Sequence, residues 1–205
     1  MAILRANNNT LSSVTALPFA TGGLVKISTT TASNASAVEF TELSTASTYS
    51  HFKIILDNVT ASTDNSAIFY AQFGTGGASP TYYTGANYQC VGVSAFAHIA
   101  SMSQRQSYNV AQMTLAYTTT SGYAFPGEAF EYLSGTINLF RFADANHQPS
   151  IVFQLHAPVS GTVEQSIAGS ASVRKNASFG NATAFKLYCS TGNINGTFTL
   201  YGITA

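Results

Sequence analysis

Apolar and polar residues alternate with period two along much of this chain. The clearest run covers residues 51–60, where Phe52, Ile54 and Leu56 fall on one side of an extended segment. Side chains of a β-strand point alternately to its two faces, so this alternation predicts a strand with one buried face. No window of helical length carries an apolar stripe with a 3.6-residue period, and we therefore expect no long α-helix.

Short β-prone segments follow one another between clusters of Gly, Asn, Ser and Thr. The expected strands cover residues 24–27, 36–43, 51–60, 67–73, 88–102, 104–117, 131–142, 150–156 and 164–173, and residues 29–34 are expected to form a loop. This rhythm is typical of a β-sandwich or barrel. We predict an all-β fold, a single antiparallel β-sandwich of the jelly-roll kind.

The last 22 residues, 184–205, contain two alternating segments around a turn. Residues expected to share a face are Phe185, Leu187 and Cys189 in the first segment, and Phe198, Leu200 and Gly202 in the second. The turn at 191–196 holds two glycines and two asparagines, which tolerate positive φ. These features predict a hairpin that closes a sheet.

Residues 1–23 lack a clear period although they contain apolar side chains. The apolar positions are Ile3, Leu4, Leu11, Val14, Leu17 and Phe19. We interpret this stretch as an N-terminal arm that docks on another molecule, followed by one sandwich domain over 24–205. A frayed terminus or a first edge strand is the alternative interpretation.

The run 88–102 is long, β-prone and poor in charge. Both of its faces are expected to be buried, one by the core and the other by a second subunit. Exposed, such a strand would favour aggregation, and symmetric association would bury it.

The chain of 205 residues carries 8 basic and 8 acidic side chains, a formal net charge of zero. Without a basic block we expect no nucleic-acid partner. No apolar run approaches the ~18 residues of a membrane span, and no signal peptide is recognisable, so we expect synthesis in a cytoplasm and no membrane insertion. A chain with so few charges gains little solubility from net charge, so we expect part of its surface to be buried in an assembly.

Candidate catalytic and metal-binding residues are few. Cys90 and Cys189 are expected to be buried free thiols, with a disulfide as the alternative if their strands are neighbours. The four histidines show no metal-ligand spacing, so neither a metal nor a cofactor is expected. Glu128 and Glu131, beside aromatic residues, are the nearest approach to a carboxylate pair, and we expect no enzymatic activity.

Two aromatic loops are the candidate binding elements. The first contains Tyr82, Tyr83 and Tyr88, and the second contains Tyr117, Tyr123 and Phe125. Tyrosine combines a flat apolar face with a polar tip, which suits a subunit or virion interface, core packing, or contact with a glycan. The sequence leaves these three roles open.

The segment S-T-G-N-I-N-G-T-F-T-L-Y-G-I at 190–203 resembles the ending S-S-G-N-I-x-S-G-x-I-x-L-Y-G of small β-rich proteins from tailed bacteriophages. Residues 37–41, 48–54, 58–60 and 63–65 resemble early strands of the same proteins, and the opening residues 1–18 resemble their N-terminus. These proteins are described as tail-fibre-like or virion structural proteins.

The resemblance implies a tail-associated virion protein, made in the host cytoplasm, that forms a homotrimer and helps in host attachment. It also implies that the arm contacts other virion proteins. The first alternative is a capsid decoration or head-fibre protein whose arm locks onto the head. A second alternative is a free carbohydrate-binding module that holds a host surface glycan through the tyrosine loops.

Overall fold

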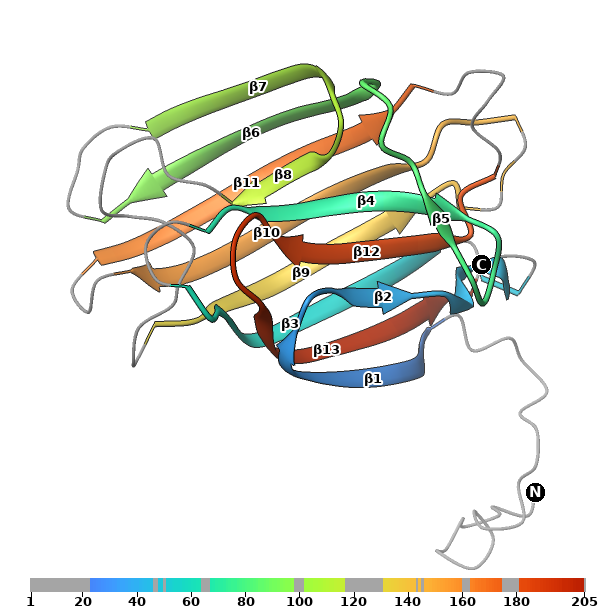
Figure 1. Ribbon diagram of the computed structural model, residues 1–205, viewed down its shortest axis with the longest axis horizontal. Coiled ribbons are helices and arrows are strands. Elements are labelled where there is room, and N and C mark those ends of the chain that lie inside the picture. The colour runs from blue at the N-terminus through green and yellow to red at the C-terminus, as the bar shows by residue number, and fades with distance from the viewer. Residues whose placement is uncertain are drawn as a thin grey trace, which may run out of the picture.

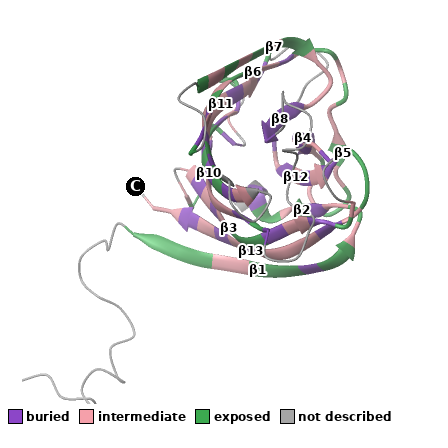
Figure 2. Ribbon diagram, turned by 90° about the vertical axis from the view of Figure 1, so that its left-hand side faces the viewer, coloured by how far each residue is buried: buried purple, intermediate pink, exposed green. Residues whose placement is uncertain are grey.

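Two antiparallel β-sheets face each other in the computed structural model, which describes residues 23–45, 48–49, 51–63, 67–97, 102–116, 131–142, 144, 146–159, 163–174 and 181–204. Figure 1 shows the smaller sheet in front of the larger one, and Figure 2 shows the larger sheet curving around it. The predicted all-β sandwich is confirmed, while the jelly-roll connectivity stays a prediction.

The larger sheet has eight strands. In spatial order they are β1 (Leu24–Ala35), β13 (Ile194–Ile203), β3 (His51–Ala61), β9 (Leu133–Phe140), β10 (Ser150–Val159), β11 (Val163–Val173), β6 (Tyr88–Phe96) and β7 (Met102–Val110). Figure 1 shows β1 at one edge of this sheet and β7 at the other.

The smaller sheet has five strands. Its order is β2 (Val38–Phe40), β12 (Ala184–Cys189), β4 (Phe69–Thr75) and β5 (Thr81–Tyr82), and β8 (Met113–Ala116) also pairs with β4. A short 3-10 helix, η1 (Glu42–Thr45), follows β2.

The core fills the space between the sheets. The predicted inward positions of β3, which are Phe52, Ile54 and Leu56, are at most 1% exposed. An aromatic cluster lies beside them, with Phe73 of β4 at its centre and Phe142 and Phe185 within 6 Å of it, measured between ring centroids. Burial of these rings is the main favourable term in the folding of such a domain.

The last two strands do not pair with each other, which corrects the predicted closing hairpin. β12 belongs to the small sheet, between β2 and β4, and β13 belongs to the large sheet, between β1 and β3. The predicted buried faces are nevertheless confirmed, because both strands turn these residues toward the core. The apolar faces of β12 and β13 meet from opposite sides of the core. The two strands therefore belong to different sheets, and the chain crosses from one sheet to the other between them.

The residues that flank a second crossing, from β3 to β4, contact the residues that flank this one. The backbone N–H of Ser62, after β3, donates to the carbonyl of Asn193 at 2.7 Å, and the N–H of Asn193 donates to Ser62 Oγ at 2.7 Å. Before β4, the N–H of Ile68 donates to Ser190 Oγ at 2.9 Å, and the N–H of Ser190 donates to the Ile68 carbonyl at 2.9 Å. These four bonds give the backbone N–H groups at the ends of both crossings partners within the protein.

Several boundaries differ from the predictions. The expected strand 104–117 is divided into β7 of the large sheet and β8 of the small sheet. Residues 29–34, expected as a loop, continue β1, because an edge strand with two accessible faces tolerates Thr and Ser. The expected strand 36–43 is shorter and passes into η1. The run 88–102 ends as a strand at Phe96, and only one face of β6 is buried in the single chain.

Candidate binding surface

The outer face of the large sheet over β10, β11, β6 and β7 carries ordered rows of uncharged side chains. The strand register places Val152, Ser170, Val91 and Gln106 in one row across the four strands. The next row holds Gln154, Ala168, Val93 and Gln104 in the same strand order. Alternation sends these residues outward and their sequence neighbours into the core.

Small side chains on β11 leave a depression in this face. Ala168, Ser170 and Ser172 form the floor, and longer side chains of β10, β6 and β7 rise on either side. Two adjoining hollows of about 510 and 480 Å³ share Val91 and Ser170 in their linings. We call the two together the groove.

Exposed apolar side chains gather at the groove. Among the described residues, eight large apolar side chains are exposed, and five of them lie on this face, with exposed fractions of 40–69%. These five are Val91, Val93, Met102, Tyr108 and Val152. An apolar patch of this kind with a polar rim is the usual signature of a recognition surface.

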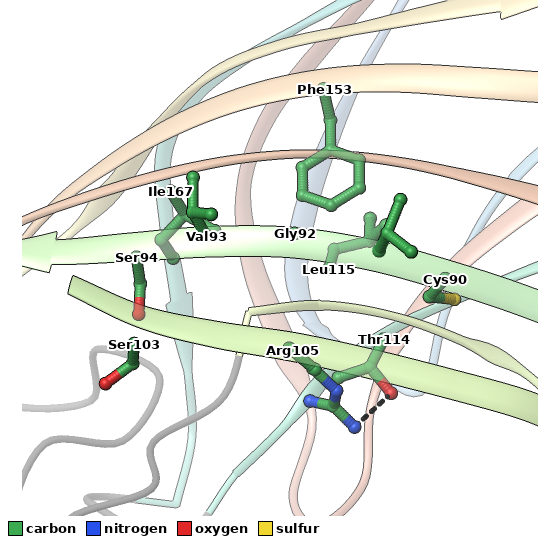
Figure 3. A pocket seen from close by; sticks show the side chains of 11 residues that line it. Cys90, Gly92, Val93, Ser94, Ser103, Arg105, Thr114, Leu115, Phe153 and Ile167 are labelled. Carbon is green, nitrogen blue, oxygen red and sulfur yellow. Dashed lines mark hydrogen bonds between the residues drawn. The ribbon is translucent and has the colours of Figure 1, made fainter.

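Charged groups on this face are turned away or paired. Arg105 of β7 directs its guanidinium inward, where Nη2 donates to Thr114 Oγ1 at 3.0 Å (Figure 3). At one end of the strands, His156 Nε2 lies 2.7 Å from Glu164 Oε2. At the other end, Arg174 Nη1 donates to the Tyr108 hydroxyl at 3.1 Å. The groove therefore favours a partner surface without strong charge.

Two glycines explain how the sheet accommodates a ring beneath the groove. Gly169 of β11 pairs directly with Gly92 of β6, and Phe153 of β10 is the next residue in the same row. A Cβ added at Gly169 would lie 2.6 Å from Phe153 Cζ, so the ring occupies the space that the glycine leaves free. Between the sheets, a residual cavity of about 20 Å³ remains near Phe153 and Leu115 (Figure 3).

Tyr88, predicted as a binding residue, is instead part of the core. Its side chain is 0% exposed, and its hydroxyl accepts a hydrogen bond from the Phe73 N–H at 2.9 Å and donates to the Tyr83 carbonyl at 3.0 Å. Burial raises the pKa of the Tyr88 hydroxyl, which keeps it protonated as a donor. Core packing, one of the three roles considered, is the role of this residue.

Replacing Tyr88 by phenylalanine is expected to lower the free energy of unfolding by about 1–3 kcal/mol, because the Phe73 N–H and the Tyr83 carbonyl lose a buried partner. Urea denaturation followed by fluorescence measures this loss. The matched control is Tyr108→Phe, an exposed tyrosine for which we expect a change within about 0.5 kcal/mol. Equal stabilities for wild type and Tyr88→Phe would contradict the assignment.

Tyr82 and Tyr83 are held by their own neighbours. Tyr83 is half-buried, accepts a hydrogen bond from Asn87 Nδ2 and packs edge-on against Tyr88. The ring centroid of Tyr82 lies 4.3 Å from Lys186 Nζ, and that ammonium is also 4.9 Å from the ring centroid of Tyr188. A ring whose face is already covered by an ammonium is a poor platform for a sugar.

These contacts belong to an outer patch of the small sheet that the sequence did not reveal. Tyr70 and Tyr188 lie 5.5 Å apart between ring centroids, because the two strands pair them directly. Burial, and to a smaller extent the nearby Tyr70, raises the pKa of Tyr188 to about 12. Burial lowers the pKa of Lys186, although the nearby Glu39 carboxylate opposes this shift. The alternation of β4 and β12 was the only sequence signal for this patch.

The other predicted site residues lie outside the described residues. They are Tyr117, Tyr123 and Phe125 of the second aromatic loop, and Ile3, Leu4, Leu11, Val14, Leu17 and Phe19 of the predicted arm. Their binding roles stay predictions.

Both cysteines are free and buried, as predicted. Burial raises the pKa of the Cys189 thiol to about 12 and also raises that of Cys90, so neither is a ready nucleophile at neutral pH. Of the two carboxylates considered as a pair, Glu131 is buried at 4% exposure, and Glu128 lies outside the described residues. Within the described ranges, no three His, Cys, Asp or Glu side chains come together as a metal site.

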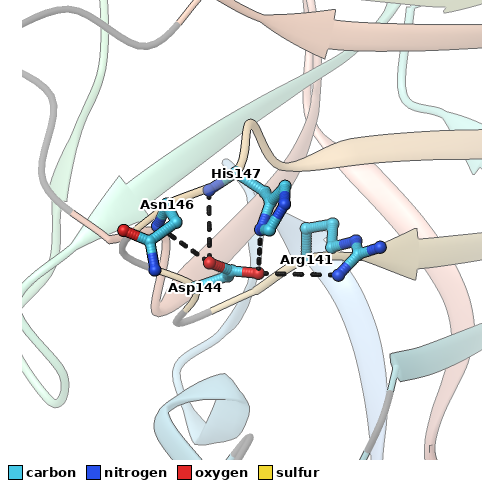
Figure 4. A network of polar contacts seen from close by, with 4 residues as sticks. All are labelled: Arg141, Asp144, Asn146 and His147. Carbon is cyan, nitrogen blue, oxygen red and sulfur yellow. Dashed lines mark hydrogen bonds and ion pairs between the residues drawn. The ribbon is translucent and has the colours of Figure 1, made fainter.

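One polar network organises the connection between β9 and β10 (Figure 4). The Asp144 carboxylate accepts hydrogen bonds from the backbone N–H groups of Asn146 at 2.8 Å and His147 at 3.2 Å. Its second oxygen lies 2.7 Å from His147 Nδ1 and 3.7 Å from Arg141 Nη1. The bond from Asn146, and then those from His147, lower the pKa of Asp144. These contacts are local, and the network shapes an exposed turn.

Comparison of the chain with protein-family models, with curated proteins and with solved structures finds no match. In the part of the chain that the structure describes, no helix is long and apolar enough to cross a membrane. The binding surfaces described above are therefore interpreted from their own chemistry.

Proposed function

We propose that this protein is a non-enzymatic structural component of a tailed-bacteriophage particle, associated with the tail and involved in host attachment. The observation that carries the proposal is the uncharged groove, whose face presents five exposed apolar side chains as a surface for assembly. The resemblance of residues 190–203 to the ending of phage virion proteins supports the same function.

The proposed assembly is a homotrimer whose predicted arm, residues 1–23, contacts other virion proteins. Gly23 is the first described residue and lies directly before the edge strand β1, so an arm would join the described domain at a sheet edge. A segment that leaves from an edge can reach a neighbouring protein without disturbing the core.

The same observation favours one alternative, a capsid decoration or head-fibre protein. Such a protein would use the arm, residues 1–23, to hold the capsid lattice and would expose the sandwich on the head. The free glycan-binding module is less well supported, because Tyr88 is buried and Lys186 covers Tyr82.

Immunogold electron microscopy of intact particles with an antibody against this protein tests the proposal. We expect gold at the tail, and label over the head would establish the decoration alternative instead. Antibody absorbed with the purified protein is the control for unspecific label. Particles without any label would overturn the virion proposal and favour the glycan-binding module, whose test is glycan binding by Tyr82→Ala and Tyr83→Ala variants.

A further inference from the structure

The groove is one of two exposed apolar sites on the large sheet. The other lies at the start of β1, where Leu24 and Val25 are 54% and 43% exposed. Together the two sites hold six of the eight exposed large apolar side chains among the described residues. β1 and the groove strand β7 form opposite edges of the same sheet, so the two sites face different directions.

The outer edge of β1 also has backbone groups that are available for hydrogen bonding. Within the described residues, β1 pairs with a single strand, β13, over most of its 12 residues. Its outer edge therefore presents N–H and C=O groups that a partner could bind. Lys26 is the only charged residue of β1, so the strand carries little charge into an interface.

We propose that β1 of one copy of this chain lies in the groove of the next copy. Leu24 and Val25 would bury Val91, Val93 and Val152, and the amides of the groove glutamines would bind the open backbone edge. A glutamine amide both donates and accepts hydrogen bonds, which suits a strand edge that presents both kinds of group.

Such a contact joins two different surfaces and is head-to-tail. A head-to-tail contact closes into a ring when its rotation permits, and it otherwise forms an open filament. The inference rests on the proposed function only for the number of copies, because the resemblance to phage proteins implies a homotrimer. A closed ring of three would leave no groove and no β1 edge exposed.

Light scattering coupled to size-exclusion chromatography tests the inference at micromolar concentration. The full chain is expected at three times its mass of 21.5 kDa. Two variants each remove one half of the contact: the β1 variant, Leu24→Asp with Val25→Asp, and the groove variant, Val91→Asp with Val93→Asp. Each variant alone is expected to be a monomer. The control Tyr132→Asp changes an exposed residue outside both sites and is expected to stay trimeric.

Mixing the two variants is the decisive step. The groove of the β1 variant is intact, and so is the β1 of the groove variant, so an equimolar mixture is expected to form a 1:1 complex of twice the chain mass. A contact between like surfaces predicts no complementation of this kind. A monomeric wild type, a trimeric variant, or a mixture that stays monomeric would overturn the inference.

Circular dichroism checks that the variants keep their strands. If the aspartates disturb folding, Val91→Thr with Val93→Thr changes the same face with nearly isosteric side chains. We expect at least a tenfold weaker association for this variant, and unchanged association would contradict the proposal. The experiment uses purified protein, so its outcome is independent of where gold labels the particle.

Discussion

Replacing Phe73 by alanine should lower the free energy of unfolding by about 3–5 kcal/mol, the largest loss expected from one side chain in this core. Phe73 is fully buried, and its ring contacts those of Tyr88, Phe142 and Phe185, at centroid distances of 6.0, 5.2 and 5.7 Å. Truncation removes the transfer free energy of the ring and leaves a cavity between rings that are fixed by their own strands.

Thermal unfolding measured by differential scanning calorimetry checks this expectation. In a domain of this size, each kcal/mol of lost unfolding free energy lowers Tm by roughly 2–4 °C. The Tm of Phe73→Ala should therefore be at least about 6 °C below that of the wild type. Phe73→Leu is the control, because it keeps most of the apolar volume and should lose far less stability. A Tm shift of Phe73→Ala no larger than that of Phe73→Leu would contradict the assigned role.

Replacing Gly135 by alanine should cost about 3–4 kcal/mol, although it adds a single methyl group. A Cβ at this position would lie 2.2 Å from the Gln154 carbonyl oxygen and 2.8 Å from Leu155 Cα, both in the neighbouring strand β10. The φ of Gly135 is +154°, which side chains rarely adopt. Because the obstacles are backbone atoms of a central strand, rotamer changes cannot relieve the clash.

Gly77 provides the matched control for Gly135. Its φ is +62°, yet no heavy atom lies within 4 Å of an added Cβ. Gly77→Ala should therefore lose only the conformational term, about 1 kcal/mol. Urea titration of both variants separates the steric contribution from the conformational one, and equal losses would show that contact with β10 is not the cause.

In β3, β12 and β13, local alternation was sufficient to predict which side chains enter the core. Phe52 and Ile54 in β3, Leu187 in β12 and Leu200 in β13 are all buried as their patterns indicate. The two-residue period is a property of each strand alone, so it can be recognised without knowing which strands pair. The all-β class followed from the same signal.

Strand partners could not be predicted in this way. The turn at 191–196 has hairpin residues, but β12 and β13 lie in different sheets because both need the same core. The polar edge strand over 29–34 was missed since its Thr and Ser side chains face solvent on both sides. Pairing depends on the rest of the fold, and alternation carries no information on it.

The candidate binding surface was predicted only in outline. The run 88–102 indicated one core face and one face for a partner, and Val91 and Val93 do lie outward on β6. The groove itself depends on β11, whose small residues become a floor only when β10 and β6 flank them. Tyr88 was misjudged because it was grouped with the preceding aromatic loop, although it also begins the predicted strand and shares the inward face of Cys90.

The position of β1 beside β13 has a consequence for how the protein is made. Leu24 pairs with Ile203, and in the small sheet Val38 pairs with Leu187, so the first two strands find their partners only in the last two. At 5–20 residues per second, the early strands emerge from the ribosome on the order of ten to forty seconds before those partners exist. Contacts of such high sequence separation slow folding, and both sheets can be completed only after β12 and β13 have emerged. A chain cut short before β12 would leave both early strands unpaired, so it could complete neither sheet.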